Sequence, residues 1–168
     1  YHTGVTAKYI FEKLARIPVE VDLASEFRYR DPILPENTLV VIVSQSGETA
    51  DTLAALRLAK EKGVRTLGIV NVVGSSIARE ADNVMYTWAG PEIAVATTKA
   101  YSTQLIAQYL LAMKFAKVRG TVSQNDFDAM IQSLERLPEQ ISLLLSHKEN
   151  VQRFANRYLA AEHVFFIG

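Results

Sequence analysis

Residues 44–49, Ser-Gln-Ser-Gly-Glu-Thr, carry the side chains of this 168-residue sequence that are best suited to bind a ligand. Hydroxyl and amide groups can donate hydrogen bonds to an oxyanion without carrying a charge. In this segment those groups belong to Ser44, Gln45, Ser46 and Thr49. A helix that begins directly after such a segment adds free backbone N–H groups and a partial positive charge. The residue types therefore predict a phosphate cradle with further donors for sugar hydroxyls.

The flanking sequence predicts that this segment lies at the end of a buried strand. Residues 38–43 are continuously apolar and β-branched, as in a strand that is buried on both faces, and residues 49–62 repeat apolar positions at helical spacing. In an open α/β sheet, ligands bind beyond the carboxyl ends of the strands. Glu48 and Asp51 oppose anion binding, because a carboxylate ~6 Å from an anion costs about 3 kcal/mol per unit charge at an effective dielectric constant near 20. Both side chains must therefore point away from the ligand.

A second interpretation of the segment stays open on spacing alone. Serine and threonine are common at helix starts, so Ser46 or Thr49 could be a plain N-cap in a polar strand-to-helix turn. The segment matches neither the G-x-G-x-x-G dinucleotide fingerprint nor the P-loop, and it contains no lysine or arginine. Anion binding would depend on neutral donors and on the start of the helix.

The alternation of strands and helices along the chain predicts an α/β fold. We expect a three-layer αβα arrangement of flavodoxin-like type, with helices on both faces of a mostly parallel sheet of roughly five strands. The expected strands cover residues 19–23, 38–43, 65–72, 83–88 and 163–168. The expected long helices cover residues 5–16, 49–62, 98–118 and 123–161, the last interrupted near Pro138 and near His147.

The composition excludes several classes of function. The sequence has 18 basic and 18 acidic residues, so no net charge attracts nucleic acid or an anionic membrane. It has no cysteine, which excludes disulfides, thiolate metal sites and a cysteine nucleophile. The three histidines are far apart and lack metal-ligand spacing, so we expect no metal site. No run approaches the ~18 apolar residues that span a bilayer, and no signal peptide opens the chain, so we expect a cytoplasmic protein.

The stretch SQSGETADTL, residues 44–53, closely resembles the phosphosugar-binding loop of sugar isomerase (SIS) domains. Four further stretches resemble the isomerase part of the glutamine–fructose-6-phosphate aminotransferases, namely residues 1–4, 24–30, 71–80 and 89–101. The resemblance extends over essentially the whole chain, in order. It implies one SIS lobe over residues 1–162 and the start of a second, truncated lobe at residues 163–168.

The resemblance also implies a ligand set. The phosphate and neighbouring hydroxyls of fructose 6-phosphate or glucosamine 6-phosphate would be held by Ser44, Gln45, Ser46 and Thr49, and the sugar would contact Val95 and Thr97. The family more often has serine where Thr97 stands; threonine keeps the hydroxyl and adds a methyl group. The family's catalytic glutamate, lysine and histidine would lie beyond Gly168, so none of the residues present is expected to be catalytic.

The implied function is that of the phosphosugar-binding lobe of a transferase that makes glucosamine 6-phosphate from fructose 6-phosphate and glutamine, in hexosamine synthesis. This enzyme family needs no cofactor. We expect the whole enzyme, of which this chain would be one lobe, to be a homodimer that binds neither nucleic acid nor a membrane. The 168-residue chain alone is expected to bind sugar phosphate without turnover. Two alternatives stay open: a phosphosugar-sensing SIS domain of a regulator, which would be expected to carry a helix-turn-helix segment, and a stand-alone phosphosugar isomerase.

Overall fold

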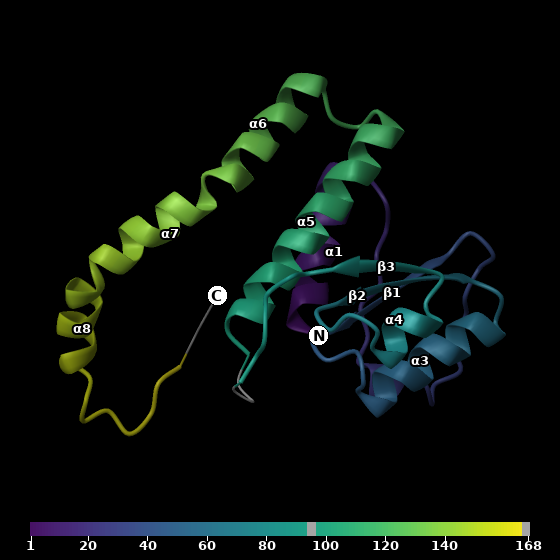
Figure 1. Cartoon of the computed structure of the whole chain (residues 1–168), viewed down its shortest axis with the longest axis horizontal. Coiled ribbons are helices and arrows are strands. Elements are labelled where there is room, and N and C mark those ends of the chain that lie inside the picture. The colour runs from purple at the N-terminus through teal and green to yellow at the C-terminus, as the bar shows by residue number, and fades with distance from the viewer. Residues whose placement is uncertain (94–96, 166–168) are drawn as a thin grey trace. The chain divides into compact units, whose positions relative to one another are not determined.

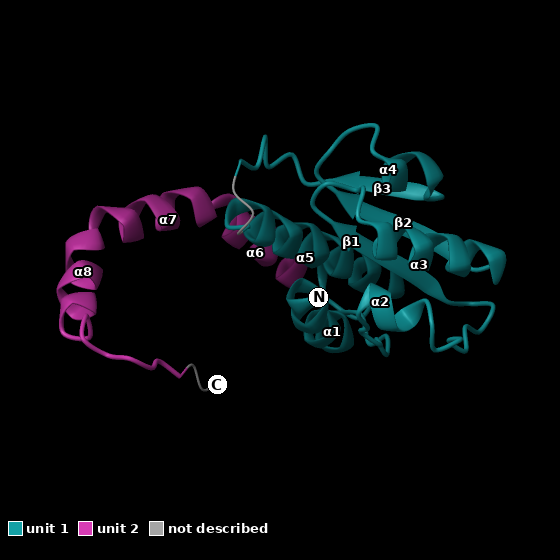
Figure 2. Ribbon diagram, turned by 90° about the horizontal axis from the view of Figure 1, so that it is seen from below, with its two compact units in different colours: residues 1–124 teal, residues 125–168 magenta. Residues whose placement is uncertain are grey.

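The computed structural model describes residues 1–93 and 97–165. The chain divides into two compact units, Tyr1–Gln124 and Asn125–Gly168, which Figure 2 colours separately. Within the described residues, no helix combines the length and the apolar character needed to cross a membrane.

The first unit contains a parallel sheet and the helices that cover it (Figure 1). Its elements, in chain order, are α1 (His2–Leu14), α2 (Ala24–Phe27), β1 (Leu39–Ser44), α3 (Ala50–Glu61), β2 (Arg65–Val70), α4 (Ser76–Glu80), β3 (Asn83–Tyr86) and α5 (Lys99–Arg119). The expected α/β character and parallel sheet are confirmed.

The sheet places the ends of its strands level with one another. Its strands lie in the order β1-β2-β3, and both neighbouring pairs are parallel. Ser44 at the end of β1 pairs with Val70 at the end of β2, and Val70 pairs with Tyr86 at the end of β3. The three segments that follow these residues therefore leave the sheet side by side, at the edge where α/β proteins bind their ligands.

Helices cover both faces of this sheet. In Figure 1, α3 and α4 lie on one side of the strands, and α1 and α5 lie on the other. The core under α3 and α4 is a cluster of buried apolar side chains, Ile42, Ala55, Leu56, Val70 and Ile77. Complete burial of a leucine or isoleucine side chain stabilises the fold by about 1.5–3 kcal/mol. This packing fixes the positions at which α3 and α4 begin.

The sheet has three strands among the described residues, and not the roughly five that the sequence suggested. Residues 19–23 form no strand, although their pattern alternates. Asp22 gives the physical reason, because its carboxylate accepts the N–H of Leu23 at 2.9 Å and pairs with Arg30 Nε at 2.5 Å. Such local bonds compete with a strand ladder. Of the last expected strand, residues 163–165 are not in a strand, and residues 166–168 lie outside the described residues.

The helices that end the chain are α6 (Gln124–Glu135), α7 (Leu137–Ser146) and α8 (Lys148–Asn156). The expected interruptions near Pro138 and His147 are confirmed. Pro138 lies in the first turn of α7, where its missing N–H removes no helical hydrogen bond. The consecutive residues Leu143, Leu144 and Leu145 of α7 are 62%, 72% and 65% exposed.

Candidate functional site

The loop of residues 44–49, here called the phosphate loop, connects β1 to α3 and is folded by its own hydroxyl groups. Gly47 N–H donates to Ser44 Oγ at 3.0 Å, and Glu48 N–H donates to Ser46 Oγ at 3.2 Å. Gly47 has a φ of 71°, a left-handed conformation that glycine adopts readily. Ser44 is buried, whereas Ser46 is half-buried. Because an oxygen that accepts a hydrogen bond still carries its own proton, both hydroxyls can donate to a ligand.

The start of α3 has no side-chain cap. Thr49 occupies the N-cap position with an extended backbone, φ −63° and ψ 122°, and makes no side-chain capping hydrogen bond. Ser46 does not serve as the cap either, since its oxygen is bonded to Glu48 N–H. Thr49 is thus the N-cap residue by position, as the second interpretation expected, but its side chain does not supply a capping hydrogen bond. The uncapped first turn of α3 retains the partial positive charge and the donors that favour an anion.

The structure brings four of the expected ligand residues together on the phosphate loop, namely Ser44, Gln45, Ser46 and Thr49. Gln45 is half-buried and Thr49 is exposed. Thr97 is exposed and immediately precedes Thr98, the N-cap of α5; no hydrogen bond between described residues joins it to the phosphate loop. Val95 lies outside the described residues.

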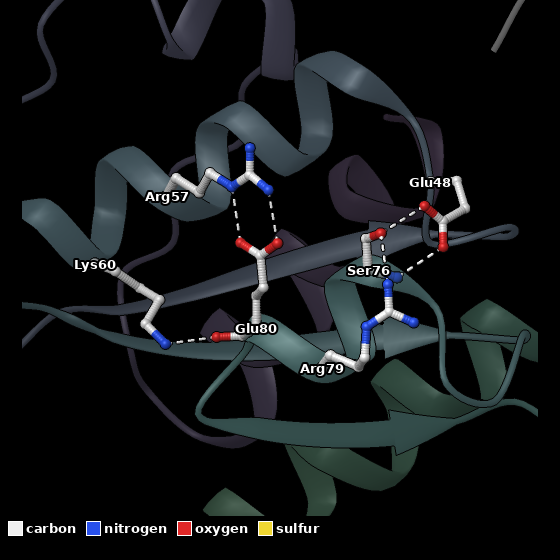
Figure 3. A network of polar contacts seen from close by, with 6 residues as sticks. All are labelled: Glu48, Arg57, Lys60, Ser76, Arg79 and Glu80. Carbon is white, nitrogen blue, oxygen red and sulfur yellow. Dashed lines mark hydrogen bonds and ion pairs between the residues drawn. The ribbon is translucent and has the colours of Figure 1, made fainter.

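Both acidic residues near the phosphate loop are engaged by other groups. Glu48 accepts the backbone N–H of Ser76 and the Ser76 hydroxyl, each at 2.7 Å (Figure 3). These two hydrogen bonds hold the pKa of the Glu48 carboxyl below its ordinary value, so the group is ionised at neutral pH. Asp51, in the first turn of α3, pairs with Arg28 at 2.7 Å. The expectation that Glu48 would have to turn away from an anion agrees with its contact to α4.

The phosphate loop rests directly on the start of α4. Ile77 N–H donates to Gly47 O at 3.0 Å, and Ser75, the N-cap residue of α4, is buried against Gly47. A Cβ atom on Gly47 would lie inside the contact distance of Ser75. The glycine is therefore required by the close approach of two loops as well as by its positive φ.

Asn71 joins the ends of all three strands, and sequence reasoning missed it. Its backbone N–H donates to Gln45 O at 3.1 Å. Its side-chain Oδ1 accepts from Thr87 Oγ1 at 3.1 Å and from Ala89 N–H at 2.8 Å, while Nδ2 donates to Gly90 O at 2.8 Å. An amide near the end of the expected strand 65–72 was the only sequence signal, and the partners become visible only with the register of the sheet.

The surroundings of the phosphate loop suit a site that binds an anion through neutral donors. They suit a metal site or a site for an apolar ligand less well. In the described part of the chain, no three His, Asp or Glu side chains gather as metal ligands. A cavity of about 900 Å³ runs beside β1, and Thr49 is the only residue of the phosphate loop that lines it. Most of its wall is apolar, from α1, residues 17–25 and β1, so the cavity offers a dianion little.

Comparison with known proteins gives a consistent result. The model of the SIS domain family matches residues 1–114. The glutamine–fructose-6-phosphate aminotransferase [isomerizing] of Caldanaerobacter subterraneus subsp. tengcongensis is 58% identical over 168 residues, which are 100% of this chain and 28% of that protein. The enzyme of the same name from Clostridium acetobutylicum is 55% identical over the same shares of the two chains.

Solved structures show the same similarity. The C-terminal domain of glucosamine-fructose-6-phosphate aminotransferase from Francisella tularensis superposes with a TM-score of 0.90 at 38% identity, over 94% of this chain and 45% of that chain. Glucosamine-6-phosphate deaminase from Thermotoga maritima superposes with a TM-score of 0.67 at 28% identity, over 79% of this chain and 40% of that chain.

Proposed function

Because the chain belongs to the SIS domain family, we propose that its phosphate loop binds the phosphate group of a sugar phosphate. The resemblance to the isomerase part of the glutamine–fructose-6-phosphate aminotransferases is confirmed, since relatives of that name are similar along the whole chain. The chain spans 28% of the length of these relatives, so the activity of a whole enzyme is part of the proposal.

The observation that carries the proposal is the position of the start of α3 directly beside the hydroxyls of the phosphate loop. Backbone N–H groups at a helix start, together with the hydroxyls of Ser46 and Thr49, form a set of neutral donors suited to a phosphate dianion. Arg28 engages Asp51 and Ser76 engages Glu48, which lowers the electrostatic cost of bringing an anion close. No cation within the phosphate loop is needed.

In the whole aminotransferase, this lobe would bind the phosphate group of fructose 6-phosphate and of the product, glucosamine 6-phosphate. An anchored phosphate fixes the sugar relative to catalytic acids and bases, which is a large part of the rate enhancement in such reactions. Val95 and Thr97 would contact the sugar in this scheme. The proposal includes a cytoplasmic homodimer and a lobe boundary between residues 162 and 163. Similarity along the entire chain supports an aminotransferase over a regulator or a stand-alone isomerase.

Calorimetric titration of the chain with fructose 6-phosphate and with glucosamine 6-phosphate tests the proposal. Removal of one hydroxyl donor to a charged group typically costs about 1.5–3 kcal/mol, so Ser46→Ala and Thr49→Ala should each weaken binding about tenfold or more. Ser142→Ala, which removes an exposed hydroxyl of α7, is the matched control. Equal binding by wild type, Ser46→Ala and Thr49→Ala would place the ligand elsewhere.

A further inference from the structure

Helix α4 is held at both ends by charged side chains, as Figure 3 shows. At its C-terminal end, Arg57 of α3 binds the Glu80 carboxylate through Nε at 2.8 Å and through a terminal nitrogen at 2.7 Å. Lys60 Nζ also donates to Glu80 O at 2.5 Å. At the N-terminal end, Glu48 binds Ser76 through both carboxylate oxygens. The first contact joins two helices, whereas the second joins α4 to the phosphate loop.

The contact of Glu48 reinforces two others between the same partners. Gly47 O accepts Ile77 N–H, and Gly47 packs against the buried Ser75. Glu48 lies between Ser46 and Thr49, two of the residues with the donors expected to bind phosphate. The orientation of Ser46 and Thr49 therefore depends on how firmly the peptide units around Glu48 are held.

We propose that Glu48 is a positioning residue of the sugar-phosphate site. Its carboxylate anchors the phosphate loop to the start of α4, and the same contact keeps its negative charge directed toward Ser76. The proposal rests on the function proposed above and adds a role for the acidic residue within the loop. Glu48 touches no reacting atom in this scheme, because it acts through the position of Ser46 and Thr49.

Two effects of Glu48 on anion binding have opposite signs, which makes the role testable. Its charge disfavours a nearby phosphate. Its anchoring contact favours phosphate binding by holding the donors in place. Glutamine at this position could accept the Ser76 N–H through Oε1 and donate to Ser76 Oγ through Nε2, so it keeps the anchor and removes the charge. Alanine removes both.

The experiment is calorimetric titration of fructose 6-phosphate into the wild-type chain and into Glu48→Ala and Glu48→Gln. We expect Glu48→Ala to bind about tenfold more weakly, and Glu48→Gln to bind within about threefold of wild type or more tightly. A residue that acted only as a nearby negative charge would give tighter binding in both variants. Binding by Glu48→Ala that equals or exceeds wild-type binding would overturn the proposal.

Glu80→Ala is the matched control, because it removes a glutamate from the other end of the same helix. It should change the affinity by less than about twofold, since the contact of Glu80 with Arg57 does not involve the phosphate loop. An effect as large as that of Glu48→Ala would show that general loosening of α4 is the cause and would overturn the positioning role.

Hydrogen exchange of the Ser76 amide provides a readout that does not depend on the ligand. This amide donates to Glu48, so it should exchange faster in Glu48→Ala and near the wild-type rate in Glu48→Gln. Unchanged exchange in Glu48→Ala would show that the anchor is absent. If the wild-type chain binds neither fructose 6-phosphate nor glucosamine 6-phosphate, the proposed function is overturned, and this inference with it. Tighter binding of fructose 6-phosphate by Glu48→Ala would overturn this inference alone.

Discussion

A Cβ atom placed on Gly47 would lie 2.1 Å from Ser75 Oγ and 2.6 Å from Ser75 Cβ, so the phosphate loop and the start of α4 approach too closely for any side chain at this position. The backbone of Gly47 is also left-handed, with a φ of 71°. Gly63, with a φ of 77°, shares the left-handed conformation, but a Cβ atom placed there would meet no heavy atom of the described residues within 4 Å. Alanine substitutions at the two glycines can therefore separate the free-energy cost of backbone strain from the cost of steric overlap.

Gly47→Ala should destabilise the chain more than Gly63→Ala does. The left-handed conformation alone costs an alanine about 1–2 kcal/mol, and overpacking adds about 1–3 kcal/mol at Gly47. Urea denaturation measures both free energies of unfolding. Gly47→Ala combined with Ser75→Gly should recover part of the loss, because both clashing atoms are removed. Equal destabilisation by the two single substitutions would contradict the close approach.

Asn71→Ala should loosen the segment that follows β3. The substitution removes the three side-chain hydrogen bonds to Thr87, Ala89 and Gly90, and we expect a loss of about 1–3 kcal/mol in the free energy of unfolding. Asn83→Ala, at the exposed start of β3, should change it by less than about 0.5 kcal/mol. Faster hydrogen exchange of the Ala89 amide in Asn71→Ala would localise the effect, and an unchanged rate would argue against it.

Arg28→Ala should weaken sugar-phosphate binding by releasing the charge of Asp51. The pair is partly exposed, with side-chain exposures of 32% for Arg28 and 48% for Asp51, so the change in stability should stay within about 1 kcal/mol. Calorimetry should show about three- to tenfold weaker binding for Arg28→Ala. Adding Asp51→Asn to that variant should restore the affinity, because the uncompensated charge is then gone. Failure of the second substitution to restore binding would exclude this electrostatic explanation.

The loss of folding stability at acid pH should depend on Asp82. The hydroxyl and the backbone N–H of Thr66 both donate to its carboxylate at 2.8 Å, and they hold the pKa of Asp82 below its ordinary value of 3.8. The folded chain thus binds this proton less readily than the unfolded chain does. The resulting stabilisation is fully present above the unfolded pKa and is lost as the pH falls through the lower, folded pKa.

Asp82→Asn should therefore make the free energy of unfolding less dependent on pH in the acid range below about pH 5. Urea titrations at a series of pH values measure this slope. Thr66→Val, which removes the hydroxyl and keeps the backbone N–H, should give an intermediate slope. Identical slopes for wild type and Asp82→Asn would show that Asp82 does not contribute to the pH dependence of the free energy of unfolding.

Local patterns were enough to predict most of the first unit. Residues 38–43 and 65–72 are rich in β-branched side chains, and they contain nearly all of β1 and the whole of β2. The helical spacing of residues 49–62 predicted α3 to within one residue at each end. The alternation in residues 19–23 was misleading, because strand formation requires a partner and Asp22 instead bonds Leu23 and Arg30.

The partners of the site residues could not be predicted, since they depend on contacts between distant segments. The donor types of the phosphate loop were readable from the sequence, but the partner of Glu48 is Ser76, 28 residues further along the chain. Asn71 joins Gln45 on one side and Gly90 on the other only because the strands end level with one another. Proposals for the sugar contacts of Val95 and Thr97 continue to depend on family resemblance.

The exposed leucines of α7 have a practical consequence for handling the chain. Leu143, Leu144 and Leu145 expose three large apolar side chains to water, and the formal net charge at pH 7 is zero. Electrostatic repulsion between molecules is then at its weakest, so the chain should aggregate in concentrated solutions near pH 7. Dilute samples, or buffers a unit or two away from pH 7, keep the molecules dispersed.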